Sequence, residues 1–182
     1  MQPIKLLARD LNVTAIRWAL LSNPQLWNEN TARTQDESSP HHGLDDIWVR
    51  FGSPEDAETG QPHVAHWYDS ADTLGVKPMI EDVFKAVGGV ELGGVLITRI
   101  PVGASCRPHV DPGWHARYYE KFALQIDSAP GQMFCFEGAA LETRPGDLFW
   151  FDNQYLHWVD NPTAYDRITM IICIKRGEQH AS

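Results

Sequence analysis

A short segment near the middle of the chain combines two residue types that bind metal ions. His109 and Asp111 are separated by one residue, and a further histidine, His157, follows much later in the chain. Because side chains alternate faces along an extended strand, His109 and Asp111 would project to the same side, about 6–7 Å apart along the backbone. Two imidazoles and one carboxylate on one face of Fe(II) form the facial triad of non-heme oxygenases, which leaves coordination positions open. The pattern therefore predicts one reactive metal site.

Each part of this pattern also has an ordinary structural interpretation. Asp111 could cap a turn while His109 packs in a sheet, and a lone histidine such as His157 is more often a packed or surface residue than a ligand. The position of the pair before Pro112-Gly113, at the end of an expected strand, favours the mouth of a barrel, where ligand pockets form. Three ligands without a fourth cysteine or histidine nearby favour an open, reactive metal over a closed structural zinc.

Arg167 begins a run that is otherwise apolar. A guanidinium that enters such a run needs an anionic partner, because a buried charge without one is very costly. The partner could be the neighbouring Asp166 or another acid of the protein. It could instead be a ligand carboxylate held by two parallel hydrogen bonds, for which arginine has the right geometry. In the second case 2-oxoglutarate would bind the metal through its keto-acid end and present its far carboxylate to Arg167.

Other aromatic and histidine residues give weaker signals. Trp150 and Trp158 flank the expected site, and packing is their commonest role, although one of them, for which we choose Trp150, could line the cofactor pocket. The pair His63 and His66 lacks the carboxylate and strand context of the main site. The remaining histidines are expected to face solvent: His41, His42, His115 and His180.

The elements that must position these residues are mostly strands. Turn residues divide the chain after Val90 into about eight short β-rich segments, which is typical of an antiparallel jelly roll. The expected strands are 94–100, 106–110, 117–126, 132–136, 141–143, 147–151, 157–159 and 167–174. Before them, hydrophobic spacing predicts a helix over 11–22, a short strand at 47–51, and a helix that starts at Pro78 and ends before Gly88.

We therefore expect a mainly β protein with flanking helices (α+β). Its 182 residues, 43% of them hydrophobic, suit one domain over 1–182, with a helical and loop region at 1–89 and a β core at 90–176. Several residue motifs together resemble the aspartyl/asparaginyl β-hydroxylase family of 2-oxoglutarate oxygenases, which also includes cis-proline hydroxylases. The motifs are Thr98-Arg99-Ile100-Pro101-Val102-Gly103, Arg107-Pro108-His109-Val110-Asp111, Arg144-Pro145-Gly146-Asp147-Leu148-Phe149-Trp150-Phe151, His157 and Arg167.

The resemblance covers about Val95 to Ile174 and implies a cupin-like double-stranded β-helix. It implies iron at His109, Asp111 and His157, with Arg167 on the distal carboxylate of 2-oxoglutarate. It also implies that the Thr98 hydroxyl helps to hold that carboxylate and that Lys121 stands near a basic position that contacts the co-substrate. Some relatives have glycine where this chain has Asp111, so the retained carboxylate argues against a halogenase-like site.

The expected function is an Fe(II)- and 2-oxoglutarate-dependent dioxygenase that hydroxylates an unactivated C–H bond of an amino acid, free or within a peptide or protein. O₂ would be the second co-substrate, with ascorbate as a reductant. Two alternatives stay open: a cupin-like metal enzyme that does not use 2-oxoglutarate, and a non-catalytic barrel that binds a small molecule. The sequence leaves the prime substrate and the oligomeric state undetermined.

The charge of the chain limits its partners. The formal net charge is −9, and the 15 Lys and Arg residues are dispersed, so a nucleic-acid partner is not expected. No apolar run approaches the length of a membrane span or signal peptide, and three cysteines suit reduced thiols, so we expect a cytoplasmic protein. An acidic stretch between Asp36 and Glu58, with Arg50 as its one basic residue, is either solvated surface or a lid that favours a cationic substrate.

Overall fold

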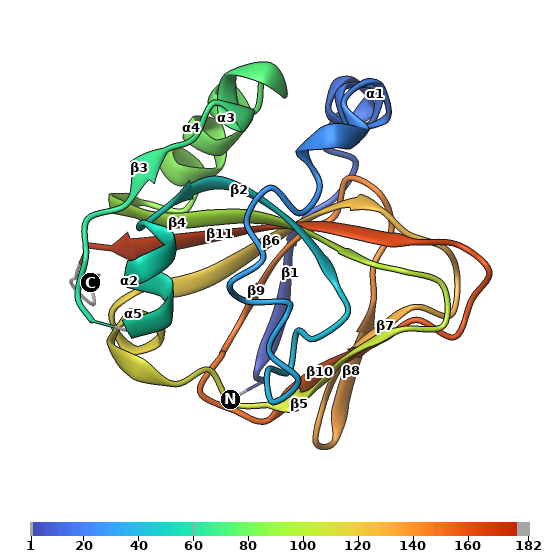
Figure 1. Ribbon diagram of the computed structural model, residues 1–182. Helices are drawn as coiled ribbons and strands as arrows, with labels where there is room; N and C mark the ends of the chain where they lie inside the picture. The colour runs from blue at the N-terminus through green and yellow to red at the C-terminus, as the bar shows by residue number, and fades with distance from the viewer. Residues whose placement is uncertain (1, 60, 178–182) are drawn as a thin grey trace.

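Two antiparallel β-sheets face each other and form the body of the protein (Figure 1). The structure, a computed structural model, describes residues 2–59 and 61–177. The larger sheet contains, in spatial order, β1 (Ile4–Ala8), β9 (Leu148–Phe151), β6 (Glu120–Asp127), β11 (Arg167–Arg176), β4 (Gly89–Ile100), β2 (Asp45–Phe51) and β3 (His66–Trp67). The smaller sheet contains β5 (Ser105–His109), β10 (His157–Asp160), β7 (Met133–Phe136) and β8 (Ala139–Glu142).

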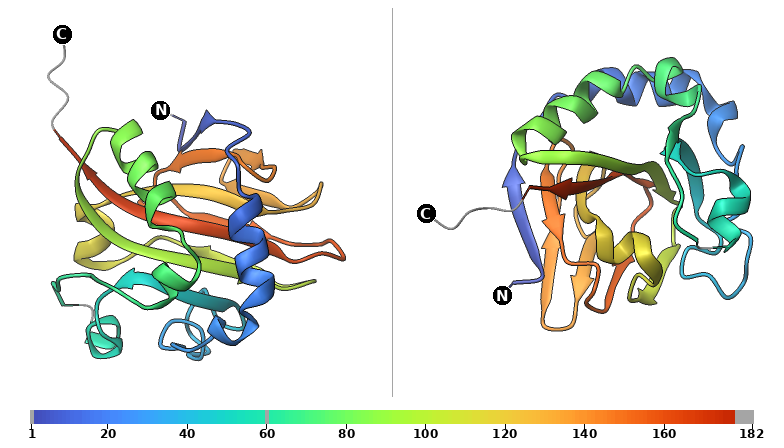
Figure 2. Two further views of the ribbon diagram at one scale, coloured as in Figure 1. Left: turned by 90° about the horizontal axis from the view of Figure 1, so that it is seen from above. Right: turned by 90° about the vertical axis from the view of Figure 1, so that its left-hand side faces the viewer.

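Helices cover the outer face of the larger sheet (Figure 2). α1 (Thr14–Ser22) and α4 (Lys77–Ala86) direct apolar side chains such as Ile16 and Ile80 onto strands β4, β6 and β11. Pro78 stands in the first turn of α4, where its missing N–H costs nothing, and Gly88 follows with φ +74° and ends the helix. The shorter helices are η1 (Pro24–Leu26), α2 (Pro54–Thr59), α3 (Ser70–Thr73) and α5 (Gly113–Tyr118).

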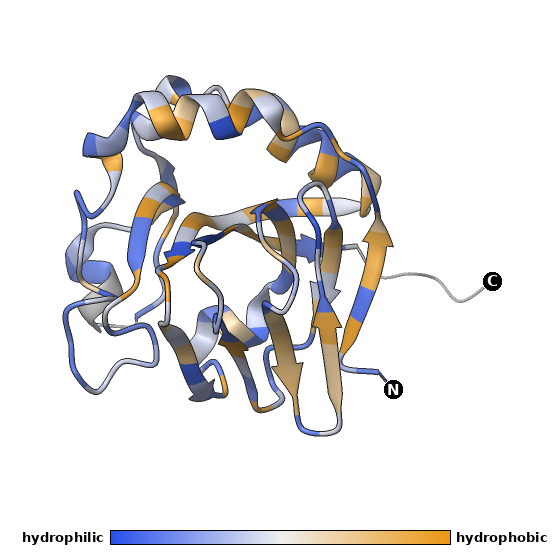
Figure 3. Ribbon diagram, turned by 90° about the vertical axis from the view of Figure 1, so that its right-hand side faces the viewer, coloured by the Kyte–Doolittle hydropathy of each residue, from blue (hydrophilic) through white to orange (hydrophobic). Residues whose placement is uncertain are grey.

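The central strands of the larger sheet are therefore buried on both faces. In β6 and β11 apolar residues run almost continuously, and Figure 3 shows hydrophobic segments in both sheets and in the helices above them. A second apolar cluster lies between the sheets, where Phe134, Phe136, Phe149 and Phe151 pack together. These rings fill one part of the space between the sheets. A cavity lies beside them.

Most of the expected elements are confirmed, with three corrections. The segment expected as a strand over 117–126 begins with the end of α5, because Tyr119 N bonds to His115 O and closes a helical turn before β6 starts. The region 1–89 contains more strand than expected, since β1 and β3 join the larger sheet together with the expected strand β2. Neither β1 nor β3 was expected. Within the described residues, no helix is long and apolar enough to cross a membrane.

Candidate metal centre and the cavity beside it

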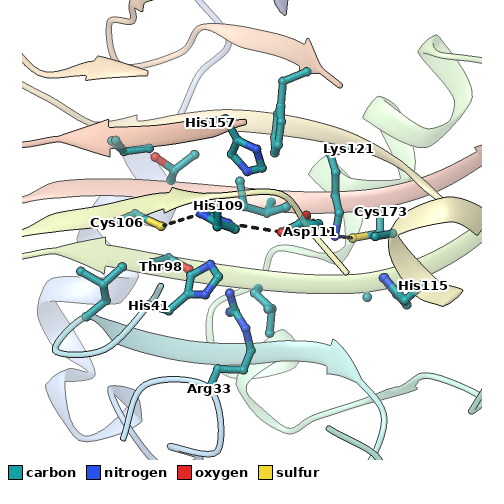
Figure 4. Close-up of a pocket in the computed structure, with 18 of the residues that line it drawn as sticks. Arg33, His41, Thr98, Cys106, His109, Asp111, His115, Lys121, His157 and Cys173 are labelled. Atoms are coloured by element: carbon teal, nitrogen blue, oxygen red, sulfur yellow. Dashed lines mark hydrogen bonds and ion pairs between the residues drawn. The ribbon is translucent and has the colours of Figure 1, made fainter. Parts of the chain in front are cut away.

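His109, Asp111 and His157 meet between the two sheets (Figure 4). Strands β5 and β10 pair with His157 directly opposite His109, and the centroids of the two imidazole rings are 4.3 Å apart. His109 Nε2 lies 3.3 Å from Asp111 Oδ1, and one donor atom from each of the three residues lies within 4.8 Å of the other two. The structure thus brings the predicted ligands together at one point that a single ion can bridge.

Backbone carbonyls orient both imidazoles. His109 Nδ1 donates to Arg107 O at 2.7 Å, and His157 Nδ1 donates to Tyr155 O at 2.9 Å. Each ring therefore presents Nε2 to the site, which is the arrangement that metal-binding histidines commonly have. The ring of Phe134 lies nearly parallel to that of His157 at a centroid distance of 5.8 Å and gives the site an apolar wall.

Asn153 positions the carboxylate of Asp111. The side-chain amide of Asn153 donates to Asp111 Oδ2 at 3.1 Å, and Asp111 N donates to Asn153 O at 3.1 Å. Lys121 Nζ is 3.8 Å from the same Oδ2. Asn153 is buried, and sequence reasoning missed it, because nothing in an isolated asparagine within a turn identifies its partner.

Burial, hydrogen bonds and neighbouring charges shift the pKa values of all three residues. Burial lowers the pKa of His109, but hydrogen bonds with Asp111 and Cys106 outweigh it and raise the value to about 10. Burial raises the pKa of Asp111, yet the charge of Lys121 and the bond from His109 hold it well below its usual range. Burial lowers the pKa of His157. Without an ion, a proton therefore holds His109 and Asp111 together, and a bound cation would take its place.

Arg167 is a buried cation without an internal acid. It is 1% exposed, and NH1 makes a single long hydrogen bond of 3.4 Å to Gln132 O. Among the described residues NH2 has no partner at all, and no carboxylate forms an ion pair with this guanidinium. Asp166 instead accepts from Val102 N at 3.2 Å, so the interpretation in which Asp166 neutralises Arg167 is wrong. Burial lowers the pKa of Arg167 to about 10.

A cavity of about 550 Å³ is lined by Arg167 and by the three predicted ligands. Thr169, Ile171 and Cys173 from β11 line it on the side of the larger sheet, because alternate residues of a strand share one face. One cavity therefore contains a buried guanidinium with a free donor together with two imidazoles and a carboxylate, which form a site for a metal ion and an anion.

Comparison with protein families identifies the chain. The family model described as "Aspartyl/Asparaginyl beta-hydroxylase" matches residues 63–177, which is more than half of the sequence. The chain belongs to this family. The matched residues include the three predicted ligands and Arg167, and they extend the resemblance seen in the sequence beyond Val95 towards the N-terminus. No curated protein matches this chain.

Solved structures with the same fold align with nearly the whole length of this hydroxylase-family protein. A Pseudomonas putida prolyl-4-hydroxylase is 17% identical with a TM-score of 0.56, covering 96% of this chain and 93% of its own. A Trichoplax adhaerens prolyl hydroxylase, solved with a hypoxia inducible factor peptide fragment, is 13% identical with a TM-score of 0.58, covering 96% and 84%. The viral collagen prolyl hydroxylase of Paramecium Bursaria Chlorella virus-1, solved with 2OG, is 10% identical with a TM-score of 0.56, covering 97% of both. These likenesses establish the jelly-roll fold.

Two further residues named from the resemblance line the cavity of this hydroxylase-family protein. Thr98 Oγ1 donates to Asp46 Oδ1 at 2.7 Å, and Lys121 Nζ donates to Cys173 Sγ at 3.2 Å. Trp150 does not reach the cavity. Its neighbours Phe149 and Phe151 point between the sheets, so Trp150 lies on the opposite face of β9 and donates to Glu120 Oε2 at 3.0 Å. The choice of Trp150 as a cofactor contact is therefore wrong.

Several histidines that were expected to face solvent line the cavity instead. His41 and His115 contribute to its wall together with His63, while His180 lies outside the described residues. His41 approaches His109 edge to face with 5.1 Å between ring centroids, and Cys106 is 4.0 Å from His109 Nδ1. The expectation that no other histidine or cysteine stands near the three ligands is thus wrong. His41 lies in the loop before β2, His63 lies between α2 and β3, and His115 lies in α5, so local patterns did not place them at the cavity.

Proposed function

We propose that the protein is an Fe(II)- and 2-oxoglutarate-dependent dioxygenase that hydroxylates a C–H bond of an amino acid, either free or within a peptide or protein. The observation that carries this proposal is Arg167, a buried guanidinium with an unpartnered NH2 that lines the same cavity as the three predicted ligands. A charge buried in this way is costly unless an anion completes its hydrogen bonds. Membership of a β-hydroxylase family supports the same conclusion.

The residues of the centre fit this cofactor. Two neutral Nε2 atoms and one carboxylate are the donor set that non-heme Fe(II) oxygenases use, and His109, Asp111 and His157 would hold the ion. Bound iron supplies the activation of O₂ coupled to oxidation of 2-oxoglutarate to succinate and CO₂, which the protein's own groups cannot perform. Arg167 would donate two parallel hydrogen bonds to the far carboxylate of 2-oxoglutarate.

The protein's part is to orient the reactants and to exclude water. Asn153 and the two backbone carbonyls fix the ligand side chains, and Phe134 and Phe151 cover His157 on the inner side. Thr98 and Lys121 stand within the cavity at positions from which a hydroxyl and an ammonium group can contact the co-substrate. O₂ as second co-substrate and ascorbate as reductant complete the proposal.

An anaerobic titration tests this function. Adding Fe(II) and then 2-oxoglutarate should produce a metal-to-ligand charge-transfer band, and admission of air should release succinate. His109→Ala should abolish the band, whereas Cys135→Ser, which changes a half-buried residue of β7 outside the cavity, should retain it. A wild-type protein that binds Fe(II) but shows no band with 2-oxoglutarate would favour the alternative of a cupin-like enzyme without this co-substrate.

The setting of the enzyme is also a proposal. Cys106, Cys135 and Cys173 are all free thiols, and Cys106 and Cys173 are buried beside the centre. Free thiols persist in reducing compartments, and a reducing compartment also keeps iron ferrous. We therefore propose a cytoplasmic location, which fractionation of cells that express a tagged chain would check.

A further inference from the structure

Few carboxylates of the acidic stretch before residue 59 line the cavity, whereas basic residues in and next to this stretch do line it. Asp36 accepts from Ser38 on the surface, and Asp45 pairs with Arg99 at 2.8 Å. The side chain of Asp46 is fully buried, and Asp56, which does line the cavity, accepts from Ser53 N at 2.9 Å near the start of α2. These four carboxylates are therefore already engaged in hydrogen bonds or ion pairs within the protein.

Arg33, which lies just before the acidic stretch, is a cationic group that lines the cavity. Its NH1 donates to Asp46 Oδ2 at 2.7 Å, and Asp46 also accepts from Thr98 Oγ1 at 2.7 Å. A guanidinium has five N–H donors, and within the described part of the chain Asp46 is the one acceptor that the Arg33 side chain uses. The side chain is 22% exposed, and Figure 4 shows it rising from its loop towards His41. Asp46 thus fixes the guanidinium and leaves further donors free to meet a ligand.

The loop that carries Arg33 is fastened in place. Ser39 Oγ donates to Arg33 O at 2.6 Å within the loop. Arg107, on the strand of His109, donates from its backbone N to Pro40 O at 2.9 Å and from NH1 to Glu37 O at 2.7 Å. Arg33 is therefore held at a set position relative to the metal centre, as a specificity residue must be.

His41 adds a second polar group at the same place. Its ring lies between Arg33 and His109 in Figure 4, 5.1 Å from the His109 ring between centroids. No hydrogen bond of this ring is found among residues 2–59 and 61–177, so its N–H can turn to a ligand.

We propose that Arg33, assisted by His41, binds a carboxylate of the prime substrate and thereby selects acidic substrates at this centre. The inference rests on the proposed function and gives it a substrate class. It replaces the expectation of a cationic substrate, because the free donors beside the predicted ligands are cationic or neutral N–H groups. Arg167 also lines the cavity and remains assigned to the co-substrate, so the proposal gives the two arginines different carboxylates.

The test measures succinate release with matched acids and amides. One arm uses free amino acids and their α-amides; the other uses end-blocked peptides that contain Asp or Glu and their Asn or Gln counterparts. In at least one arm the acid should stimulate turnover above its amide. Arg33→Gln should raise KM for that acid about ten- to a hundredfold, the loss expected for charge-assisted hydrogen bonds, and change kcat little. Arg33→Lys keeps the positive charge but loses the two-pronged hydrogen-bond geometry, so its KM should lie between those of the wild type and Arg33→Gln.

Arg99→Gln is the matched control. It removes an arginine paired with the neighbouring Asp45 of β2, but Arg99 does not line the cavity, so KM should not change. The charge-transfer band with Fe(II) and 2-oxoglutarate should be unaltered in Arg33→Gln, which separates this proposal from the proposed function. Equal stimulation by acids and amides, stimulation by neither, or an unchanged KM in Arg33→Gln while the band persists would overturn the assignment.

Discussion

Replacing Arg167 by methionine should stabilise the ligand-free protein. Burial lowers the pKa of Arg167 to about 10, and a pKa difference of one corresponds to about 1.4 kcal/mol, so keeping this guanidinium charged in the fold costs about 3 kcal/mol at neutral pH. Methionine has a similar volume and no charge, and it gives up only the long bond to Gln132 O, worth about 1 kcal/mol. The net gain of about 2 kcal/mol should raise Tm by about 4–8 °C for a chain of this size.

The same substitution should remove stabilisation by the co-substrate. In the metal-loaded wild type, 2-oxoglutarate at a hundred times its Kd should add about 2.7 kcal/mol of stability, and in Arg167→Met this increment should be largely lost. Thermal unfolding with and without 2-oxoglutarate measures both effects. Arg176→Met serves as the control, since this arginine of the same strand is paired with Glu120 at 2.7 Å; it should lose stability and keep the 2-oxoglutarate shift. The reasoning would be refuted if ligand-free Arg167→Met were less stable than the wild type. It would also be refuted if 2-oxoglutarate stabilised Arg167→Met as much as it stabilises the wild type.

Three other outcomes follow from the geometry. Asn153→Ala should weaken Fe(II) binding about ten- to a hundredfold by releasing Asp111, as a chelator competition would show, while unchanged affinity would remove its positioning role. Fe(II) affinity should rise about tenfold per pH unit between pH 6 and 8, because His109, whose pKa is raised to about 10, must lose a proton to bind; a flat profile in calorimetry would contradict this. Gly146→Ala should cost more than about 2 kcal/mol in urea unfolding, since φ is +91° and the new Cβ would stand 2.6 Å from Leu11 O; a neutral effect would count against it.

The residues of the centre were predictable because they depend on short-range rules. The one-residue spacing keeps His109 and Asp111 close together although β5 ends at His109, and the antiparallel pairing of β5 with β10 brings in His157. Arg167 was identifiable because a guanidinium in an apolar strand demands an anion. The same alternation rule, applied to β9, would have placed Trp150 on the face opposite Phe149 and Phe151, so that error lay in not using the pattern.

The cavity mouth was not predictable because long-range contacts build it. Arg33 and His41 lie in a loop with no periodic pattern, and their position depends on hydrogen bonds to Asp46 and to Arg107. Such pairings decide which side chains in and near the acidic stretch face the cavity. Composition does not reveal these pairings. Local reasoning therefore found the three predicted ligands and Arg167 but did not find Arg33 and His41 in the cavity wall.

The hydrogen bonds from Arg107 to the loop that carries Arg33 suggest a way to change the substrate selectivity of this enzyme. Arg107 holds Pro40 and Glu37 through hydrogen bonds to their backbone carbonyl oxygens. Because backbone atoms are common to all residues, the loop sequence can be redesigned or exchanged for another of equal length without loss of this anchor. Libraries that randomise positions 33 and 41 and keep Arg107 intact are thus a direct route to variants with altered selectivity.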